Sequence, residues 1–338
     1  MRSRSRSKIV LIFLRVCLNY TRCAIAATSI ISQLDNASSP ALEDLSLDLG
    51  IDPRLKLFTK SYDEYLPPRS CLMNAVEALA FLAGKDYHGT TPMTSTSIPG
   101  YTDVQIVIRP ADGALTVPVR PAVLGLYLAV LALATHPMFQ GKFQVTSWMV
   151  LWEDVTVAYI FLQLSGLGNH TQAQNLTAIP SGTMLNLNDT TPITLSENFN
   201  NGNADNSTNA PNTDVELIMS FYPWGTPLRE TSVFVTVLGV LKDVAGYPST
   251  DVVVDFEIRV PVSDVSIGFV KGSSTGLTGP PSFEYRWVID AAKQIPLWMV
   301  DHRFWESSFT IKVNNYVVGE GWVRHATYAG LDGNRTTS

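Results

Sequence analysis

The sequence predicts an α+β fold whose two related halves are built from repeated helix–hairpin (αββ) units. Two kinds of short motif predict this repeat, because they alternate in the same order through both halves of the chain. An arginine opens each of four apolar stretches, and a strand-like motif that begins with Asp or Asn follows each stretch. The arginines are Arg69, Arg120, Arg229 and Arg286, and the strand-like motifs begin at Asp103, Asp154, Asp264 and Asn315.

We expect antiparallel sheets with helices on one face, and in the second half the ferredoxin-like order of elements with one extra strand. A cation at the start of a helix opposes the helix dipole, so local electrostatics do not explain the four arginines. We therefore expect an arginine to pair with the Asp of its own unit. The expected pairs are Arg69–Asp103, Arg120–Asp154 and Arg229–Asp264.

The first half contains two predicted helices and a hairpin. Apolar residues recur at helical spacing from Leu72 to Ala83, and Gly84 is placed to end this helix. Residues 122–134 are apolar and uncharged throughout, so they predict a buried helix that is too short to span a membrane. The predicted hairpin strands, which are rich in β-formers, are 143–151 and 155–163.

The second half reads as strand, helix, strand, strand, helix, strand, strand. Residues 232–244 are ambiguous, because their β-branched content favours a strand while their length and repeat position favour a helix. We predict a helix there. The later strands are predicted at 252–260, 265–270, 309–313 and 316–323.

Composition sets the domain boundaries. Residues 166–212 hold eleven asparagines, three acids and no Lys or Arg, so they bury too little apolar surface to offset the entropy of ordering. We expect this segment to be a flexible linker between a first domain at 69–165 and a second at 213–327. The remaining segments are a predicted leader at 1–27, an extended arm at 28–68 and a disordered tail at 328–338.

The first 34 residues carry six basic residues and no acid, and the small-x-small pattern Ala24-Ile25-Ala26 ends the leader. This pattern is typical of a secretory signal peptide. An Arg-rich, Ser-rich and acid-poor leader is also typical of a mitochondrial presequence, and a mis-assigned gene start is a third interpretation. Candidate glycosylation sites favour secretion, and they are Asn36, Asn169, Asn175, Asn188, Asn206 and Asn334.

Several classes of protein are disfavoured. The formal net charge of −6 argues against a nucleic-acid partner. No apolar run approaches the roughly 18 residues of a membrane span, so no integral membrane segment is expected. Phosphate-cradling, metal-binding and nucleophile motifs are absent from the sequence, so neither a cofactor nor a metal is predicted. Cys71 would be the one cysteine left after leader removal, and we interpret it as a buried, unreactive thiol.

Two groups of residues are weak candidates for a site. Asp301 and His302, with nearby Glu306, combine carboxylates with an imidazole, which can tune a general base or bind an ion. We favour the competing interpretation of a polar connection in solvent. The aromatic residues of the second half could stack on sugar rings, although burial in the core is the favoured interpretation. They are Trp224, Trp287, Trp298, Trp305, Trp322, Tyr285, Tyr316 and Tyr328.

One resemblance covers most of residues 67–163. The stretch 67–79, the Gly125-Leu-Tyr pattern and the Trp-bearing hairpin at 148–159 resemble a family of uncharacterised proteins predicted from ascomycete fungal genomes. The family has no established activity, so the resemblance implies a fungal source and secretion and transfers no site residue.

The sequence leaves three functional hypotheses. The first is a secreted, acidic, non-enzymatic glycoprotein that recognises an extracellular, host or cell-wall ligand such as a polysaccharide. The second is a secreted hydrolase with a site between the two halves, whose catalytic residues the sequence does not identify. The third is a soluble mitochondrial protein.

Overall fold

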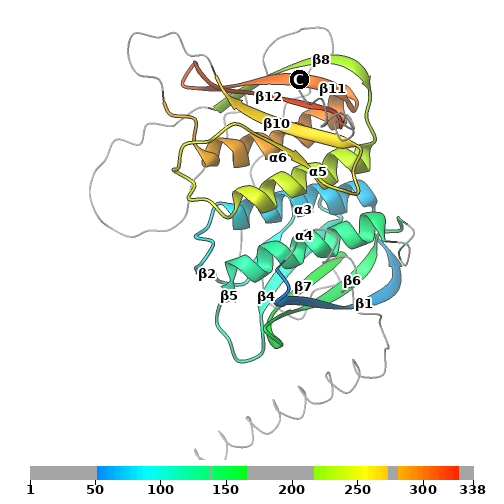
Figure 1. The fold of residues 1–338 in the computed structure, drawn as a ribbon. Coiled ribbons are helices and arrows are strands. Elements are labelled where there is room, and N and C mark those ends of the chain that lie inside the picture. Colours follow the sequence, from blue (N-terminus) through cyan, green and yellow to red (C-terminus); the bar gives the residue numbers. More distant parts are fainter. Residues whose placement is uncertain (1–51, 137–138, 140, 166–216, 273–280, 327–338) are drawn as a thin grey trace, which may run out of the picture.

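The computed structural model describes residues 52–136, 139, 141–165, 217–272 and 281–326. Within these ranges the chain is an α+β structure in which four long helices lie between two five-stranded antiparallel sheets (Figure 1). The layers run sheet, two helices, two helices, sheet, so helices cover the inner face of each sheet (Figure 1). None of the helices in these ranges has the length and apolar character that a membrane span requires.

The first sheet has the strand order β1-β6-β7-β4-β3, and its neighbouring strands are all antiparallel. A separate two-stranded sheet pairs β2 with β5. The elements of this half are β1 (Leu55–Tyr65), α3 (Pro68–Ala83), β2 (Thr90–Thr91), β3 (Thr94–Thr96), β4 (Val104–Pro110), β5 (Val117–Pro118), α4 (Val119–Thr135), β6 (Gln144–Trp152) and β7 (Val155–Leu164).

The second sheet has the strand order β8-β11-β12-β10-β9, and again every neighbouring pair is antiparallel. When strands are matched by their place in the chain, this order is the same as in the first sheet. The elements are β8 (Leu217–Pro227), α5 (Glu230–Val244), β9 (Phe256–Arg259), β10 (Val265–Lys271), α6 (Tyr285–His302), β11 (Trp305–Val313) and β12 (Tyr316–His325).

The predicted helices and hairpins are confirmed within one to four residues at most ends. α3 begins with Pro68 at its first turn, where a missing N–H costs nothing, and ends at Ala83 before Gly84. α4 is buried on almost every side because it lies between the first sheet and the other helices. The ambiguous residues 232–244 lie within α5, where packing between helices and sheet outweighs their β-branched content.

The ferredoxin-like prediction is correct for the order of elements along the second half and wrong for their arrangement in the sheet. In a ferredoxin-like sheet the first strand lies beside the third. Here the hairpin β11–β12 lies between β8 and β10 and pairs with both of them. The extra strand therefore changes the topology, because the last hairpin lies inside the sheet and pairs on both sides, whereas the single last strand of a ferredoxin-like sheet lies at its edge.

Two predicted boundaries also need correction. Residues 55–65, which we placed in an extended arm outside the first domain, form the edge strand β1 and pair with β6. The alternation of buried Leu55 and Leu57 with less buried neighbours fixes this strand on the sheet. In the second half only 256–259 of the predicted strand at 252–260 joins the sheet, because Val252 and Val254 face solvent. The predicted leader, linker and tail and all six glycosylation candidates lie outside the described residues.

The two hairpins that end the halves match in detail. Both turns place two consecutive residues at positive φ, Glu153-Asp154 in the first half and Asn314-Asn315 in the second. This conformation is that of a type I′ turn, whose twist suits a two-residue hairpin. A register shift lies the same number of residues before each turn, after Val150 in β6 and after Ile311 in β11.

The buried polar residues of α3 and α5 match as well. The Asn74 side chain donates to the carbonyl of Ser70 one turn earlier in α3 and to the carbonyl of Val104, the first residue of β4. The Thr236 hydroxyl makes the same two kinds of contact in the second half, with Ser232 of α5 and Val265 of β10. In each half one buried polar side chain thus ties a helix to the start of a strand.

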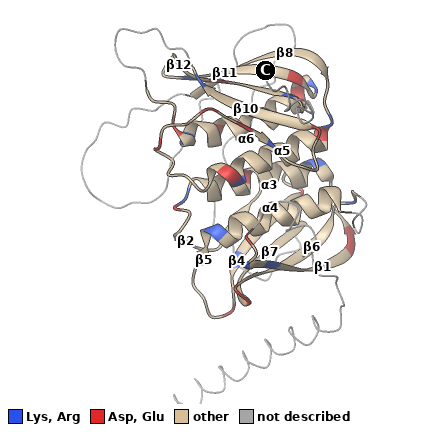
Figure 2. Ribbon diagram, viewed as in Figure 1, with Lys and Arg blue, Asp and Glu red and all other residues tan. Residues whose placement is uncertain are grey.

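Charged side chains are sparse in the helical layers, and several of them connect the two halves (Figure 2). Arg69 at the start of α3 makes a two-fold contact with Glu230 at the start of α5, at 2.7 and 2.8 Å. Lys293 of α6 lies 3.1 Å from Glu77 of α3. These pairs bridge the two helical layers.

The predicted arginine–aspartate pairs within each unit are wrong. Arg69 pairs with Glu230 of the other half, and Arg120 pairs with Asp52 at 2.6 Å. Arg229–Asp264 does not form within the described residues. The arginines do lie at helix starts, but Arg69 and Arg120 pair with acids outside their own units.

Candidate functional site

An open pocket of about 350 Å³ lies at one end of the second sheet. Three elements meet there: the C-terminal part of β8, the last turn of α6 and the first residue of β11. The residues that line it are Pro223, Trp224, Gly225, His302 and Trp305. The pocket therefore has indole, imidazole and proline walls and no charged side chain among these lining residues.

A bulge in β8 forms one wall of this pocket. Pro223 pairs with Ser307 and Pro227 with Trp305, so residues 224–226 lie opposite Glu306 alone. Gly225 at the centre of the bulge has a φ of 69°, a conformation that glycine adopts without strain. A bulge redirects the side chains next to it, and Trp224 is 46% exposed as a result.

Glu306 supports this bulge from inside the fold. Its Oε2 atom accepts hydrogen bonds from the backbone N–H of Thr226 at 2.9 Å and from the Thr226 hydroxyl at 3.2 Å. Its Oε1 atom accepts from the backbone N–H of His325 at 3.0 Å. Burial opposes ionisation of this carboxyl, but the N–H groups of His325 and Thr226 outweigh it and lower the pKa of Glu306. Both oxygens are therefore engaged in holding backbone.

His302 is held against the pocket by a stack of rings. Its imidazole lies 4.6 Å from the Trp298 indole at an interplanar angle of 6°, and Trp298 stacks in turn on Phe221 at 4.5 Å. The His302 Nδ1 atom lies 2.9 Å from the Trp298 carbonyl oxygen. Because a carbonyl only accepts hydrogen bonds, Nδ1 carries a proton, and the Nε2 atom of the neutral ring is an acceptor.

The structure separates the three residues that the sequence placed together. His302 lines the pocket, and Glu306 lies behind the pocket wall that Gly225 forms. Asp301 is exposed and is not among the lining residues of the pocket. No carboxylate is bonded to the imidazole among the described residues, so the arrangement does not add support to the general-base candidate, which we rank below a polar connection.

The aromatic candidates divide in the same way. Trp224 and Trp305 line the pocket, whereas Trp287 and Tyr285 are buried in the core as the favoured interpretation expected. Trp298 is half-buried under His302, Trp322 is half-buried over Gly268, Tyr316 is exposed at a turn, and Tyr328 lies outside the described residues.

The sequence analysis missed the bulge that shapes the pocket. The stretch Pro223-Trp224-Gly225-Thr226-Pro227 carried the signal for it, because two prolines and a glycine cannot continue a regular ladder. Such a stretch at the end of a strand predicts a bulge whose exposed side chains are redirected.

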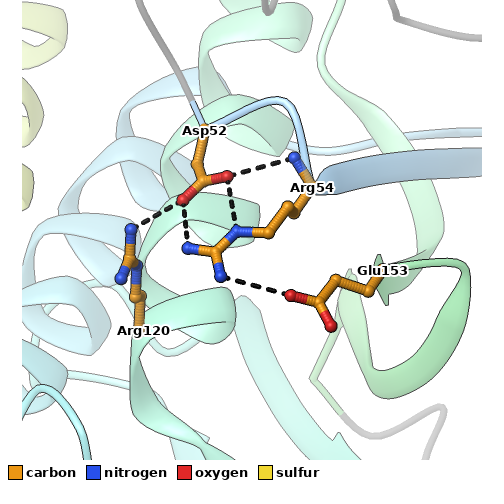
Figure 3. Close-up of polar contacts among 4 residues, drawn as sticks. All are labelled: Asp52, Arg54, Arg120 and Glu153. Carbon is orange, nitrogen blue, oxygen red and sulfur yellow. Dashed lines mark hydrogen bonds and ion pairs between the residues drawn. The ribbon is translucent and has the colours of Figure 1, made fainter.

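A second polar cluster joins three segments of the first half (Figure 3). Asp52 accepts hydrogen bonds from Arg54 at 2.7 and 2.9 Å and from Arg120 at 2.6 Å, and Arg54 also reaches Glu153 at 3.2 Å. These bonds, with the Arg120 charge, lower the pKa of Asp52 to about 2. Both guanidinium groups also lie over the Trp152 ring. The charges are paired with one another, so the cluster acts as a clamp on the start of β1.

The remaining candidate chemistry is limited in the described ranges. Cys71 is fully buried, and burial raises the pKa of its thiol, so this cysteine is unreactive. No group of three or more His, Cys, Asp or Glu residues in the described part of the chain is arranged to hold a metal ion. Comparison of the chain with models of protein families, with curated proteins and with solved structures found no match.

Proposed function

We propose that the protein is a secreted, non-enzymatic recognition protein that binds carbohydrate in the pocket between Trp224, Trp305 and His302. The exposed Trp224 indole at the rim of an open pocket carries this proposal. Sugar rings present C–H groups that pack on the faces of aromatic side chains. An open pocket with aromatic walls and few polar groups suits this kind of ligand.

The occupied carboxylate of Glu306 favours binding over hydrolysis. A glycoside hydrolase uses two carboxyl groups, of which one must donate or accept a proton at the scissile bond. Two carboxylates adjoin lining residues in the chain, Asp301 beside His302 and Glu306 beside Trp305. Asp301 is exposed and is not among the lining residues, and the oxygens of Glu306 already accept three hydrogen bonds from Thr226 and His325. We therefore rank a hydrolase below a binding protein.

The proposal includes an origin of the two halves by duplication of one unit. The shared strand order, the matched hairpin turns and the equivalent roles of Asn74 and Thr236 support it. Duplicated units diverge freely at positions outside the core. β1 has an equivalent irregularity, with residues 62–64 opposite Val145 alone, so under this proposal both copies share the bulge. The second copy differs in placing Trp224 and Gly225 on it.

Retention on insoluble polysaccharide tests the binding proposal. The full-length secreted protein is incubated with chitin, β-glucan and cellulose, and the bound fraction is measured for the wild type and for Trp224→Ala. We expect retention on at least one polymer and a loss of at least about tenfold in the variant, because stacking on an indole dominates such sites. Tyr316→Ala is the matched control, because Tyr316 is similarly exposed, at 42%, on a distant turn.

The absence of retention on all three polymers, or equal retention of the wild type and Trp224→Ala, would contradict the binding proposal. Secretion has a separate test. Mass spectrometry of culture supernatant should find a chain that begins near Thr28 and carries N-linked sugar on residues such as Asn175 or Asn206.

A further inference from the structure

We infer that the pocket selects a neutral sugar and that His302 recognises this sugar by accepting a hydrogen bond from one of its hydroxyl groups at Nε2. This inference rests on the proposed function and names the ligand class for the same pocket. It depends on three observations: the charge around the pocket, the protonated atom of the His302 ring and the size of the pocket.

The charge around the pocket disfavours an acidic ligand. No Lys or Arg is among its lining residues, so no cation is in place to pair with a uronate or a sulfated sugar. The ionised Glu306 lies directly behind Gly225, and the charged residues Asp301 and Arg303 flank His302 in the chain without being among the lining residues. A second anion brought against this wall would be repelled through a poorly solvated part of the protein.

The His302 ring offers one acceptor in a fixed position. The Trp298 carbonyl fixes the proton on Nδ1, and the stack on Trp298 fixes the plane of the ring. Nε2 has no hydrogen-bond partner within the described residues. His302 is exposed to solvent, so a sugar hydroxyl can replace water as the donor to this atom, whereas an apolar or purely accepting ligand would leave it unpaired at a cost in affinity.

The size of the pocket limits how much of a chain it contacts. Its volume of about 350 Å³ is near the lower end of the range for small-molecule sites, about 300–1,000 Å³. The pocket therefore accommodates one or two sugar rings, and a polymer would be held at a single unit. Affinity should depend little on chain length beyond that unit.

Calorimetric titration of the full-length protein with matched oligosaccharides tests the inference. The probes are hexasaccharides of β-linked glucose, of N-acetylglucosamine and of galacturonate. We expect one neutral probe to bind at least about tenfold more tightly than the galacturonate probe. The variant His302→Phe keeps the stack on Trp298 and removes Nε2, and we expect it to bind the preferred probe at least about fivefold more weakly.

Two further variants separate the possible failures. His302→Gln restores an acceptor and should recover part of the lost affinity, while near-UV circular dichroism checks that each variant is folded. Binding that Trp224→Ala abolishes but His302→Phe leaves unchanged would overturn the role of His302 and leave the proposed function in place. Equal or tighter binding of galacturonate would overturn the selection of neutral sugars. If the wild type binds none of the three probes, this inference is overturned. If the wild type is also not retained on chitin, β-glucan or cellulose, the proposed function is overturned as well.

Discussion

Glu306 of β11 lies directly beneath Gly225 of β8, so close that a Cβ atom at position 225 would overlap its Oε2 atom. The two residues depend on each other. Glycine leaves room for the carboxylate and adopts the positive φ of the bulge, and the carboxylate holds the Thr226 N–H that the bulge removes from the ladder. Trp224 owes its position at the rim of the pocket to this pair.

Substitution Gly225→Ala should destabilise the fold more than a glycine-to-alanine change at another position of positive φ. The matched control is Gly113→Ala, because Gly113 has a φ of 84° and open space around it. The Gly113→Ala control should lower the free energy of unfolding by about 1–2 kcal/mol through backbone strain alone. Gly225→Ala adds an overlap with Glu306 that should cost a further ~1–3 kcal/mol. Equal midpoints of urea unfolding for the two variants would contradict the packing seen here.

Substitution Glu306→Gln should destabilise the protein by about 1–3 kcal/mol, because the amide turns a donor toward backbone N–H groups that need an acceptor. The folded pKa of Glu306 is lowered, so its contribution is present above the pKa of the unfolded chain and is lost as the pH falls through the folded pKa. Unfolding free energies from pH 6 to pH 2.5 should therefore fall less steeply in Glu306→Gln. Parallel curves for the two proteins would count against the role of Glu306.

The clamp at Asp52 predicts a second acid-sensitive contribution. The folded pKa of about 2 lies below the unfolded value of about 3.9, so stability from Asp52 is complete above pH 5 and is lost as the pH falls toward 2. Asp52→Asn should reduce stability at pH 7 by at most about 1 kcal/mol, because solvent screens its partly exposed partners. Glu153→Gln is the control and should have no measurable effect, since Glu153 is 60% exposed. A larger loss in the control would show that Arg54 depends on Glu153 instead.

The buried polar residues of α3 and α5 predict matched losses of stability in the two halves. Asn74→Leu and Thr236→Val keep the approximate shape of each side chain and remove its hydrogen bonds. We expect a loss of roughly 2–4 kcal/mol for Asn74→Leu and roughly 1–2 kcal/mol for Thr236→Val. The Asn74 loss is larger because its amide also bonds the backbone of Ile98 and Tyr101. A thermal midpoint at or above the wild-type value for either variant would be inconsistent with these contacts.

Local structure was predictable from the sequence because it depends on local pattern. Apolar spacing located α3 and α4, and the repeat position decided that residues 232–244 form α5. The hairpins followed from the turn positions Glu153-Asp154 and Asn314-Asn315, because Asp and Asn tolerate positive φ. Each of these signals acts within a few residues of the structure it determines.

Non-local pairing was not predictable from one sequence. The insertion of β11–β12 between β8 and β10 depends on which sheet edges are free when the hairpin docks, and no residue encodes this alone. The partner of Arg69 was missed for the same reason, because Glu230 lies in the other half. His302 was named as a candidate, but its pocket depends on the bulge around Gly225, whose proline and glycine pattern was the overlooked signal.

The burial of all four helices between the sheets has a consequence for expression of the gene in pieces. α3 and α4 are covered on one side by their own sheet and on the other by α5 and α6 (Figure 1). A single half would therefore expose a large apolar surface to water. A coding sequence divided between positions 165 and 217 should give two fragments that aggregate when produced singly. Produced together in one cell, they should complement each other as a split protein does.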